Sequence, residues 1–497
     1  MKVRLLHRDR DFDARQPPPW NAEALTQDLA LGTLLDAMAG EDHLVRDVSR
    51  AVLLAGAGND IDMVVYRQAV LKDALDNRAA VRELYALTGE TLEGRRKRSF
   101  GSWMKRPASA LYTALDVMDL FATMLRRLRD LARRHAARFT SEGFTSLFSM
   151  LERELSDEYL AVVEAHLKAL KFDDGALVSG HLGPGNRGDG YILRQPRKDD
   201  RSWLQRLLER DPPALTYRIP ERDDIGARAL SDLRDRSLYL VATALTRSAE
   251  HVTGFFKTLR TELAFYIGCL ALEERLRDLG EPATLPRPSA AGARSLAGRA
   301  IYDPSLALES KGHVVGNDLD ARGRDVVIIT GANRGGKSSF LQALGLAQLM
   351  MEAGMFVAAE AFEGELSAAV LTHYKREEDA GLRRGKFDEE LARMSEIADH
   401  VGANATLLCN ESFAATNERE GSEIARQVVS AFEEKGVRVI FVTHMHTFAK
   451  DFYDRRSDRT LFLRAERLDD GTRTFKLAEG EPLATSHGKD LYRRIFA

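Results

Sequence analysis

Residues 325–339 read DVVIITGANRGGKSS, and this stretch decides the fold of the second half of the chain. An apolar run typical of a strand leads into a glycine-rich segment that matches the pattern G-x-x-x-x-G-K-S at 331–338. Apolar residues then recur at helical spacing from Phe340 to Met351, which predicts a helix with one buried face. A strand, a glycine-rich loop and a helix in this order are the setting in which such a loop wraps phosphate groups.

The glycine-rich segment predicts a site for ATP and Mg²⁺. Its backbone N–H groups can point at phosphate oxygens, Lys337 can reach the β- and γ-phosphates, and the Ser338 hydroxyl can coordinate the metal ion. The alternative is a glycine-rich turn that only caps a helix, and the strand and helix on its two sides argue against it. The residues expected to contact the nucleotide are Gly331, Ala332, Asn333, Arg334, Gly335, Gly336, Lys337, Ser338 and Ser339.

A second apolar run, ATLLCNE at 405–411, ends in Asn410 and Glu411. A nucleotide hydrolase usually ends this strand with two acids, one for the metal ion and one for the attacking water. Asn410 retains an acceptor oxygen but lacks the charge that attracts Mg²⁺, so we expect it to be a weak metal ligand. We expect Glu411 to polarise the water, the alternative being an ordinary surface acid after a strand.

A third apolar run, VRVIFVTH at 437–444, ends in His444. A histidine in this place can sense the γ-phosphate, although a histidine at the end of a strand is more often structural. His446 lies two residues further on, so the residues alone leave open which of the two histidines acts.

The composition is that of an ordinary globular protein, in which 44% of the 497 residues are hydrophobic, 30% are charged and the net charge is −3. This length favours two to four domains, and the net charge excludes a general basic field for nucleic acid. Cys269 and Cys409 lie far apart in the sequence, so they form neither a disulfide framework nor a metal cluster, and a cytoplasmic location is expected. The first residues lack a signal-peptide pattern, and the longest apolar stretch, near 263–272, is too short to cross a bilayer.

The order of patterns along the chain predicts an α plus α/β protein with two domains. Residues 1–290 read mostly as long amphipathic helices, with a small glycine-rich insertion near 173–225 that is typical of a hairpin. A segment rich in Pro, Gly and Ala at 280–294 marks the boundary, and in residues 291–497 short apolar strands alternate with helices, which favours a mostly parallel sheet. The main helical patterns cover 22–40, 62–77, 108–137, 145–170 and 235–279.

Two basic clusters lie in the helical half, at 94–106 and 125–138, and the first also contains Phe100 and Trp103. Cations beside aromatic side chains suit a nucleic-acid backbone, but a charge run is also typical of a solvated helix face that is balanced by acids. The candidate DNA-binding residues are Arg95, Arg96, Lys97 and Arg98.

Taken together, these residues resemble the ATPase domain of the MutS family of DNA mismatch-repair proteins, part of the ABC ATPase superfamily. TGANRGGKSS at 330–339 resembles the family's T-G-x-N-x-G-G-K-S-[ST] loop, and GMFVAAEAF at 354–362 resembles the strand after its helix. Thr443-His444 matches the family's T-H pair, which selects His444 over His446.

Weaker matches extend the resemblance in both directions. GNDL places Asn317 where families of this type carry an asparagine near the nucleoside, and Ser486-His487-Gly488 resembles the S-[YH]-G stretch near the family's C-terminus. DLALGTLLDAM at 28–38 and the long helices after it resemble the family's core and lever.

The resemblance implies a helical core and lever domain followed by a P-loop ATPase domain of ABC type. It implies ATP and Mg²⁺ as ligands, a homodimer that completes each site in trans, and a clamp on double-stranded or branched DNA with low sequence specificity. No membrane partner is expected. A second hypothesis stays open, in which the chain is a nucleotide-gated structural or signalling module that acts on a protein partner with little hydrolysis.

Two departures from the family pattern lead us to expect slow hydrolysis. Asn410 stands where the family has an aspartate, and Gly385-Lys386 stand where the family has a serine that reaches the partner subunit's nucleotide. The chain also begins with core-like helices. We therefore expect a short form without the N-terminal mismatch-recognition module, which does not read single mismatches.

Overall fold

The structure is a computed structural model, and it describes residues 1–56, 58, 60–99, 107–172, 177–186, 188–194, 220, 222–376, 385–468 and 472–483. The chain forms two compact units. Unit 1 contains Met1, Glu83–Ala136 and Phe148–Arg260, whereas unit 2 contains Lys2–Arg82, Ala137–Leu147 and Thr261–Ala497. This division differs from the boundary expected near residue 290, because residues 2–82 belong to the same compact unit as the C-terminal half.

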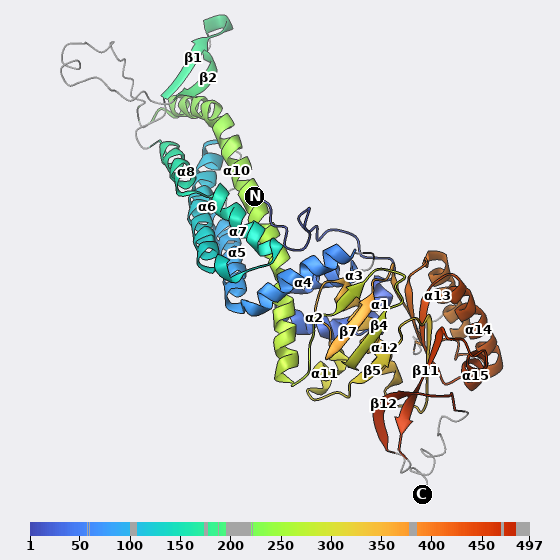
Figure 1. Ribbon diagram of the computed structural model, residues 1–497. Coiled ribbons are helices and arrows are strands. Elements are labelled where there is room, and N and C mark those ends of the chain that lie inside the picture. Colours follow the sequence, from blue (N-terminus) through green and yellow to red (C-terminus); the bar gives the residue numbers. More distant parts are fainter. Residues whose placement is uncertain are drawn as a thin grey trace. The chain divides into compact units, whose positions relative to one another are not determined.

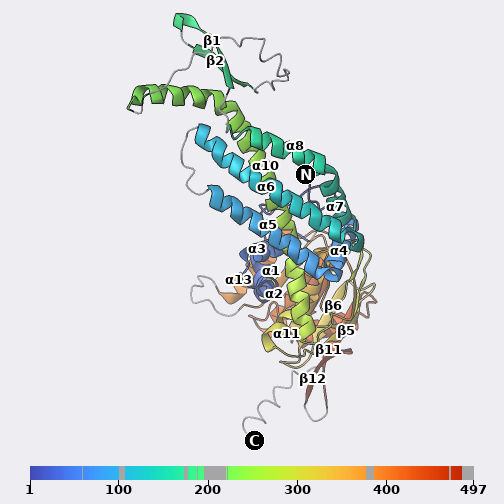
Figure 2. The ribbon, with the colours of Figure 1, turned by 90° about the vertical axis from the view of Figure 1, so that its left-hand side faces the viewer.

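Unit 1 is built from long helices. Figures 1 and 2 show α5 (Arg78–Ser99), α6 (Pro107–His135), α8 (Asp157–Ala169) and the first part of α10 (Asp224–Asp278) side by side. Leucines from α6, α8 and α10 pack together in its interior. The helix expected over 235–279 is confirmed and begins earlier, at Asp224.

The helix expected over 145–170 is two helices, α7 (Glu142–Glu154) and α8. The break falls at Ser156, whose hydroxyl accepts a hydrogen bond from the backbone N–H of Tyr159 at 3.2 Å. A serine at this position satisfies a free N–H of the next helix and so favours a new helix start.

The glycine-rich insertion contains the expected hairpin. Strands β1 (Leu177–Leu182) and β2 (Gly188–Arg194) pair antiparallel, with a short 3-10 helix, η2 (Pro184–Asn186), between them. The rest of the insertion up to residue 219 lies outside the described residues.

Helix α6 with η1 (Ala136–Arg138) is long and apolar enough to cross a membrane by length and composition. The expectation that no stretch reaches this length was therefore wrong on that criterion. A core helix of a soluble protein passes the same test, and Leu111, Leu115 and Leu128 of α6 are buried inside the structure. The helix is thus weak evidence for a membrane.

The N-terminal part of unit 2 consists of α1 (Ala22–Asp28), α2 (Leu31–Ala39), α3 (His43–Leu54) and α4 (Ile61–Asp76). The single helix expected over 22–40 is divided because Ala30 adopts a left-handed backbone with φ 48°. Left-handed backbone ends a right-handed helix.

The segment before α1 is held by one buried carboxylate. Glu262 of α10 accepts hydrogen bonds from the backbone N–H groups of Leu5 at 2.6 Å, Leu6 at 3.0 Å and Phe12 at 2.8 Å. Burial raises the pKa of Glu262 to about 7, against the lowering effect of those N–H groups. The start of the chain is therefore tied to a residue far along the sequence.

Unit 2 is organised around a six-stranded sheet with the order β12-β11-β6-β10-β9-β8. All neighbouring strands are parallel except β11 and β12, which confirms the expected mostly parallel sheet. Helices cover both faces, with α13, α14 and α15 on one face and α12 on the other (Figure 1). The strands are β6 (Val326–Thr330), β8 (Val370–Tyr374), β9 (Thr406–Asn410), β10 (Arg438–Val442), β11 (Thr460–Arg467) and β12 (Arg473–Glu479).

The apolar interior on the first face joins residues of the sheet to the three helices, among them Ile328, Leu407, Phe432, Phe441 and Phe448. The helices are α13 (Lys386–His400), α14 (Glu418–Glu434) and α15 (His446–Asp454). The strand runs expected at 325–330, 405–411 and 437–444 are thus confirmed as β6, β9 and β10, within one residue or two of their ends.

A smaller four-stranded sheet in unit 2 has the order β3-β7-β4-β5. The strand expected at 354–362 begins only at Ala361, and Val357 makes an isolated bridge to Thr284. The strands are β3 (Arg287–Ser289), β4 (Leu296–Ile301), β5 (Asn317–Asp320) and β7 (Ala361–Glu365), and α11 (Pro304–Ser310) lies between β4 and β5 in sequence.

Helix α12 (Lys337–Glu352) is buried on almost every side, whereas the sequence predicted one buried face. It lies between the sheet and the N-terminal helices, so its second face is also covered. A Cβ on Gly345 would come within 2.6 Å of both Leu29 and Leu408, which shows how closely the helix packs on either side.

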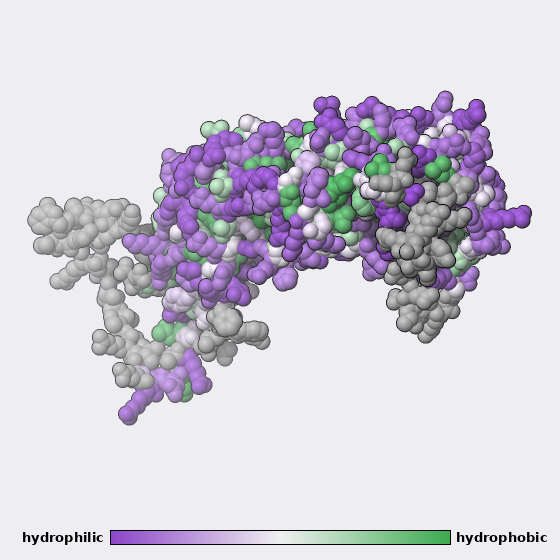
Figure 3. Space-filling view, turned by 90° about the horizontal axis from the view of Figure 1, so that it is seen from below, coloured by the Kyte–Doolittle hydropathy of each residue, from purple (hydrophilic) through white to green (hydrophobic). Residues whose placement is uncertain are grey.

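The surface face in Figure 3 is mostly hydrophilic, with small hydrophobic areas between the polar side chains. Apolar side chains scattered in this way are ordinary on a folded protein.

Candidate nucleotide site

The glycine-rich loop (residues 331–336) joins the carboxyl end of β6 to the first residue of α12. Gly331 and Gly336 have φ of 117° and 88°, which side chains rarely allow. A Cβ on Gly331 would lie 2.9 Å from the backbone nitrogen of Ala465 on β11. The two glycines therefore let the loop turn tightly against the neighbouring strand.

Lys337 is folded back into this loop. Its ammonium donates hydrogen bonds to the carbonyl oxygens of Gly331 at 2.9 Å and Ala332 at 3.0 Å, and its side chain is buried. Burial lowers the pKa of Lys337, while the charge of Glu411 raises it and that of Arg473 lowers it. A buried ammonium at the start of a helix attracts anions, as the helix N-terminus itself does.

The ends of the parallel strands bring the second group of predicted residues to the same edge. The Ser338 hydroxyl donates to the side-chain oxygen of Asn410, the last residue of β9, at 2.9 Å. The backbone N–H of Glu411 donates to the carbonyl of Val442 on β10 at 2.8 Å. The carboxyl edge of a parallel sheet is where such folds bind ligands.

Glu411 and His444 form an ion pair at this edge, with 3.4 Å between Oε2 and Nδ1. The hydrogen bond from His444 lowers the pKa of Glu411, and the same bond raises the pKa of His444. Glu411 also has φ 54°, an uncommon backbone conformation for a residue with a side chain. The pairing favours the ionised form of the carboxylate.

The residues at the edge suit Mg²⁺ held jointly with phosphates. Mg²⁺ prefers oxygen ligands and is commonly bound by one or two protein oxygens together with substrate phosphates. Ser338 and Asn410 place two such oxygens beside the glycine-rich loop. Within the described part of the chain, no group of three or more His, Cys, Asp or Glu side chains could hold a metal ion without such help.

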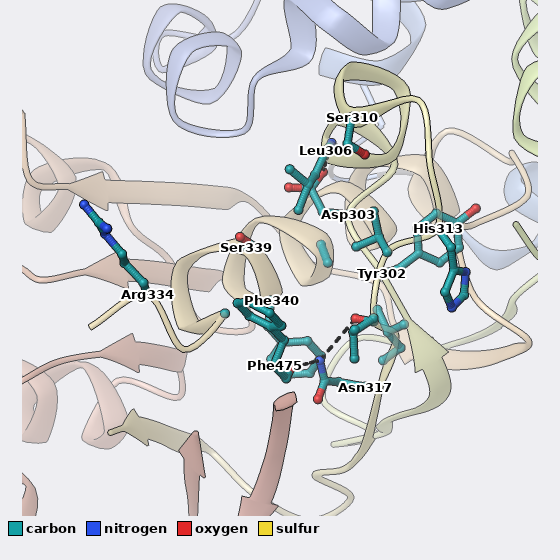
Figure 4. A pocket seen from close by; sticks show the side chains of 15 residues that line it. Tyr302, Asp303, Leu306, Ser310, His313, Asn317, Arg334, Ser339, Phe340 and Phe475 are labelled. Carbon is teal, nitrogen blue, oxygen red and sulfur yellow. Dashed lines mark hydrogen bonds between the residues drawn. The ribbon is translucent and has the colours of Figure 1, made fainter. Parts of the chain in front are cut away.

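A cavity of about 430 Å³ opens beside the glycine-rich loop (Figure 4). Arg334, Gly336 and Ser339 of the loop and α12 line one end, and Tyr302, Phe340 and Phe475 belong to its aromatic lining. Figure 4 shows Phe340 and Phe475 close together, with Arg334 pointing away from them. Cavities of this size with an apolar lining and a few polar groups are typical of small-molecule sites.

Asn317, expected near the nucleoside, lines this cavity, but its amide bonds to β12. Its nitrogen donates to the carbonyl of Phe475 at 3.1 Å, and its oxygen accepts from the N–H of Leu477 at 2.7 Å. Asn317 therefore fixes the wall that carries the Phe475 ring. The expected stretch at Ser486 lies outside the described residues.

The structure thus brings together the loop, Ser338, Asn410, Glu411 and His444, whereas the basic cluster lies in unit 1, at the end of α5. Lys97 pairs with Glu93 at 2.9 Å, and Arg98 pairs with Asp116 at 3.3 Å. Exposed pairs of this kind contribute little to the stability of a fold, so their main effect is to neutralise part of the charge of the cluster. Phe100 and Trp103 lie outside the described residues.

Sequence reasoning missed several residues of the site. Tyr302 and Phe475 line the cavity, and Lys375, next to β8, donates its N–H to the carbonyl of Asn410 at 3.0 Å. His373 of β8 contacts Ser412 directly after the predicted base. These contacts join separate segments, so no local pattern could have revealed them.

Comparisons with known proteins match both halves of the chain. Residues 59–279 match the family model described as MutS2 N-terminal domain, and residues 327–490 match that of MutS domain V. A relative named Endonuclease MutS2 from Thermus thermophilus is 28% identical over 177 residues, which is 36% of this chain and 23% of the relative.

Two relatives named DNA mismatch repair protein MutS were also found. The protein from Methanosarcina mazei is 22% identical over 425 residues, 81% of this chain and 44% of the relative. The protein from Syntrophobacter fumaroxidans is 33% identical over 140 residues, 27% of this chain and 16% of the relative. The chain thus spans less than half the length of each of these three relatives.

Matches to two models of one family lie on successive parts of the chain, and one curated protein named MutS aligns across 81% of it. On this combined evidence the chain belongs to the MutS family.

Proposed function

We propose that this protein binds ATP with Mg²⁺ in unit 2 and hydrolyses it slowly. The observation that carries the proposal is the continuity between the glycine-rich loop and the aromatic cavity. The phosphates would lie against the loop and Lys337, while the base would lie against Phe340, Phe475 or Tyr302. Membership of a family of DNA-repair-related ATPases supports the same assignment.

Each residue at the sheet edge has a definite part in the proposed reaction. Bound Mg²⁺ would neutralise charge on the phosphates, and Ser338 and Asn410 would hold it. Glu411 accepts a proton from the attacking water, and His444 keeps that carboxylate ionised. Because Asn410 carries no charge, it attracts the metal ion less than an aspartate would, and we propose slow hydrolysis for this reason.

Nucleotide binding tests the assignment directly. Lys337→Ala should remove most of the affinity for Mg·ATP, measured by titration with a fluorescent ATP analogue. Lys435→Ala is the matched control, because Lys435 ends α14 and is exposed. Glu411→Gln should retain bound ATP and lose turnover. Equal affinity in the parent and in Lys337→Ala would show that the site is misassigned.

We further propose that the active form is a homodimer with two composite sites. Helix α13 begins at Gly385 and Lys386, the segment that resembles the part of the family that reaches the partner's nucleotide. The N-terminus of a helix favours an anion, and Lys386 adds positive charge there. Glu411→Gln with ATP should sediment as a dimer, whereas a monomer at micromolar concentration would contradict the proposal.

For the partner we propose double-stranded or branched DNA, held as in a clamp with low sequence specificity. The names of the relatives and the basic end of α5 support this. One observation favours the second hypothesis, a protein partner. In the basic cluster Lys97 and Arg98 already pair with acids, which reduces the charge available for a phosphate backbone.

A binding experiment separates the two partners. Plain, mismatched and branched duplexes are titrated with the full chain, with and without Mg·ATP, at several salt concentrations. DNA binding that weakens steeply with salt and changes with ATP supports the DNA partner. Tight ATP binding without DNA affinity at low salt would favour the protein partner.

A further inference from the structure

One buried contact links the end of β9 to helix α13, and the reaction described above does not use it. His373 of β8 is completely buried between them. Its Nδ1 lies 2.7 Å from the Ser412 hydroxyl, and its Nε2 lies 3.0 Å from the carbonyl of Glu390 on α13. We call these three residues, with Phe413, the His373 junction.

The proton positions in the junction follow from the partners. A carbonyl only accepts, so Nε2 must carry the proton that bonds to Glu390. Burial and then the charge of Arg393 lower the pKa of His373 to about 4, so the ring is neutral at pH 7 and Nδ1 is an acceptor. The Ser412 hydroxyl can therefore donate to Nδ1, or to the His373 carbonyl at 2.8 Å. One imidazole thus contacts helix α13 through Nε2 and the loop after β9 through Nδ1.

A second set of contacts joins the same two elements. The ring of His373 stacks on Phe413, with centroids 5.6 Å apart and 28° between the planes. Burial raises the pKa of the Glu390 carboxyl, and the backbone N–H groups of Ala415 and Phe413 hold it lower. The side chain of Glu390 thus contacts the loop after β9, while its backbone carbonyl accepts the hydrogen bond from His373.

The loop that the junction holds is strained on both sides of Ser412. Glu411 has φ 54° and Phe413 has φ 65°, in the left-handed region that side chains disfavour. Backbone in such regions persists only where its surroundings fix it. The His373 junction supplies contacts that fix Ser412, the residue between them.

We propose that His373 is a positioning residue that couples the seating of helix α13 to the orientation of the Glu411 carboxylate. The proposal rests on the proposed role of Glu411 as the base. A shift of α13 moves the Glu390 carbonyl, and through His373 it releases Ser412 and the backbone next to Glu411. In the proposed dimer, α13 faces the partner's ATP, so ATP in one site would act on the base of the other.

Four variants separate the two bonds of the imidazole. His373→Phe retains a ring against Phe413 and removes both bonds. His373→Gln can retain the donor toward Glu390, because its amide nitrogen reaches about as far as Nε2. His373→Asn can retain the contact with Ser412. Ser412→Ala removes that contact together with the hydrogen bond from the hydroxyl to the His373 carbonyl.

The control is His7→Phe. His7 is also a buried histidine of unit 2, and burial lowers its pKa to about 4 as well, but it lies in the N-terminal segment. The loss of His7 tests whether general destabilisation of unit 2 explains any fall in kcat seen in the His373 variants.

We expect His373→Phe to lower kcat for Mg·ATP about 10- to 100-fold, as loss of a supporting contact usually does, with KM changed less than about threefold. Neither His373→Gln nor His373→Asn should restore kcat fully, because each restores one bond. Ser412→Ala should lower kcat in the same direction, because it removes the contact with Nδ1. His7→Phe should retain the parent kcat at temperatures where it is folded.

Hydrogen exchange gives a readout independent of turnover. The N–H groups of Phe413 and Ala415 should exchange at least tenfold faster in His373→Phe than in the parent, and His7→Phe should leave them unchanged. A kcat within twofold of the parent, or unchanged exchange, would overturn the coupling. Turnover of the parent no greater than that of Glu411→Gln would instead refute the proposed hydrolysis, and the exchange result would then decide the junction.

Discussion

The charge missing from residue 410 can be restored by Asn410→Asp. The asparagine oxygen already accepts the Ser338 hydroxyl at 2.9 Å, so an aspartate of nearly the same shape fits without new volume. Residue 410 is partly exposed, so water screens the new charge. The change therefore tests the effect of charge with little change in packing.

The expected magnitude follows from Coulomb's law. Two unit charges about 4 Å apart attract by about 1 kcal/mol in water, and a divalent ion doubles this to about 2 kcal/mol. That free energy corresponds to about 30-fold tighter binding. Repulsion from Glu411 next to it opposes part of the gain, so about tenfold is the smallest effect that we expect.

The assay is a Mg²⁺ titration of ATP hydrolysis at a fixed, saturating ATP concentration. The half-saturating Mg²⁺ concentration should fall between about 10- and 30-fold, and kcat should rise. Asn417→Asp is the matched control, since Asn417 caps α14 by accepting the N–H of Glu420 at 3.0 Å and an aspartate caps equally well. A half-saturating concentration within about threefold of the parent would refute the argument that the amide limits metal binding.

Three further predictions concern other residues. Ser338→Ala should raise the half-saturating Mg²⁺ concentration in the same titration, because it removes one of the two oxygens at the site. His444→Gln should shift the acid limb of the kcat/KM profile to higher pH, toward the ordinary glutamate pKa of 4.5, because the hydrogen bond that lowers the pKa of Glu411 is lost. Charge reversal at Arg95 and Arg96 should weaken binding equally for all duplex sequences and reduce its salt dependence, measured by fluorescence anisotropy.

The Glu411–His444 pair also gives a sign for stability against pH. The lowered pKa of Glu411 contributes stability above its unfolded value, and this is lost as pH falls through the folded pKa. The raised pKa of His444 contributes stability below 6.5, and this is lost as pH rises through its folded pKa. The difference in Tm between the parent and His444→Gln should therefore be greatest at pH values between the folded pKa of Glu411 and that of His444. It should vanish at pH values well below the first and well above the second.

Three results would contradict the predictions for His444, Ser338 and the end of α5. An unshifted acid limb in His444→Gln would show that the ion pair does not set the base, and an unchanged Mg²⁺ titration in Ser338→Ala would remove its role as a ligand. Sequence-dependent losses on charge reversal would show that the end of α5 reads bases.

The grouping of residues at the candidate nucleotide site was predictable because its signals are local. The apolar runs gave β6, β9 and β10, and parallel strands bring their carboxyl ends to one edge, which places Glu411 beside His444. The His373 junction was not predictable, since its hydrogen bonds connect residues 39 and 17 positions apart. The break at Ser156 was in principle readable from its capping hydroxyl, but the apolar spacing on both sides obscured it.

The hydrogen bond from Leu5 to Glu262 spans 257 positions, and that separation fixes an order of events during synthesis. A ribosome adding about 5–20 residues per second needs roughly 13 to 50 s to bridge it. For most of that interval residues 2–82 have been synthesised, whereas the strands of unit 2 have not. The hydrogen bond from the Asn21 amide forms later still, because it is accepted by the carbonyl of Val370. The apolar faces of α1 to α3 on the nascent chain therefore stay exposed until the last third of the chain emerges. We expect a chaperone that binds nascent chains to have the longest access to these three helices.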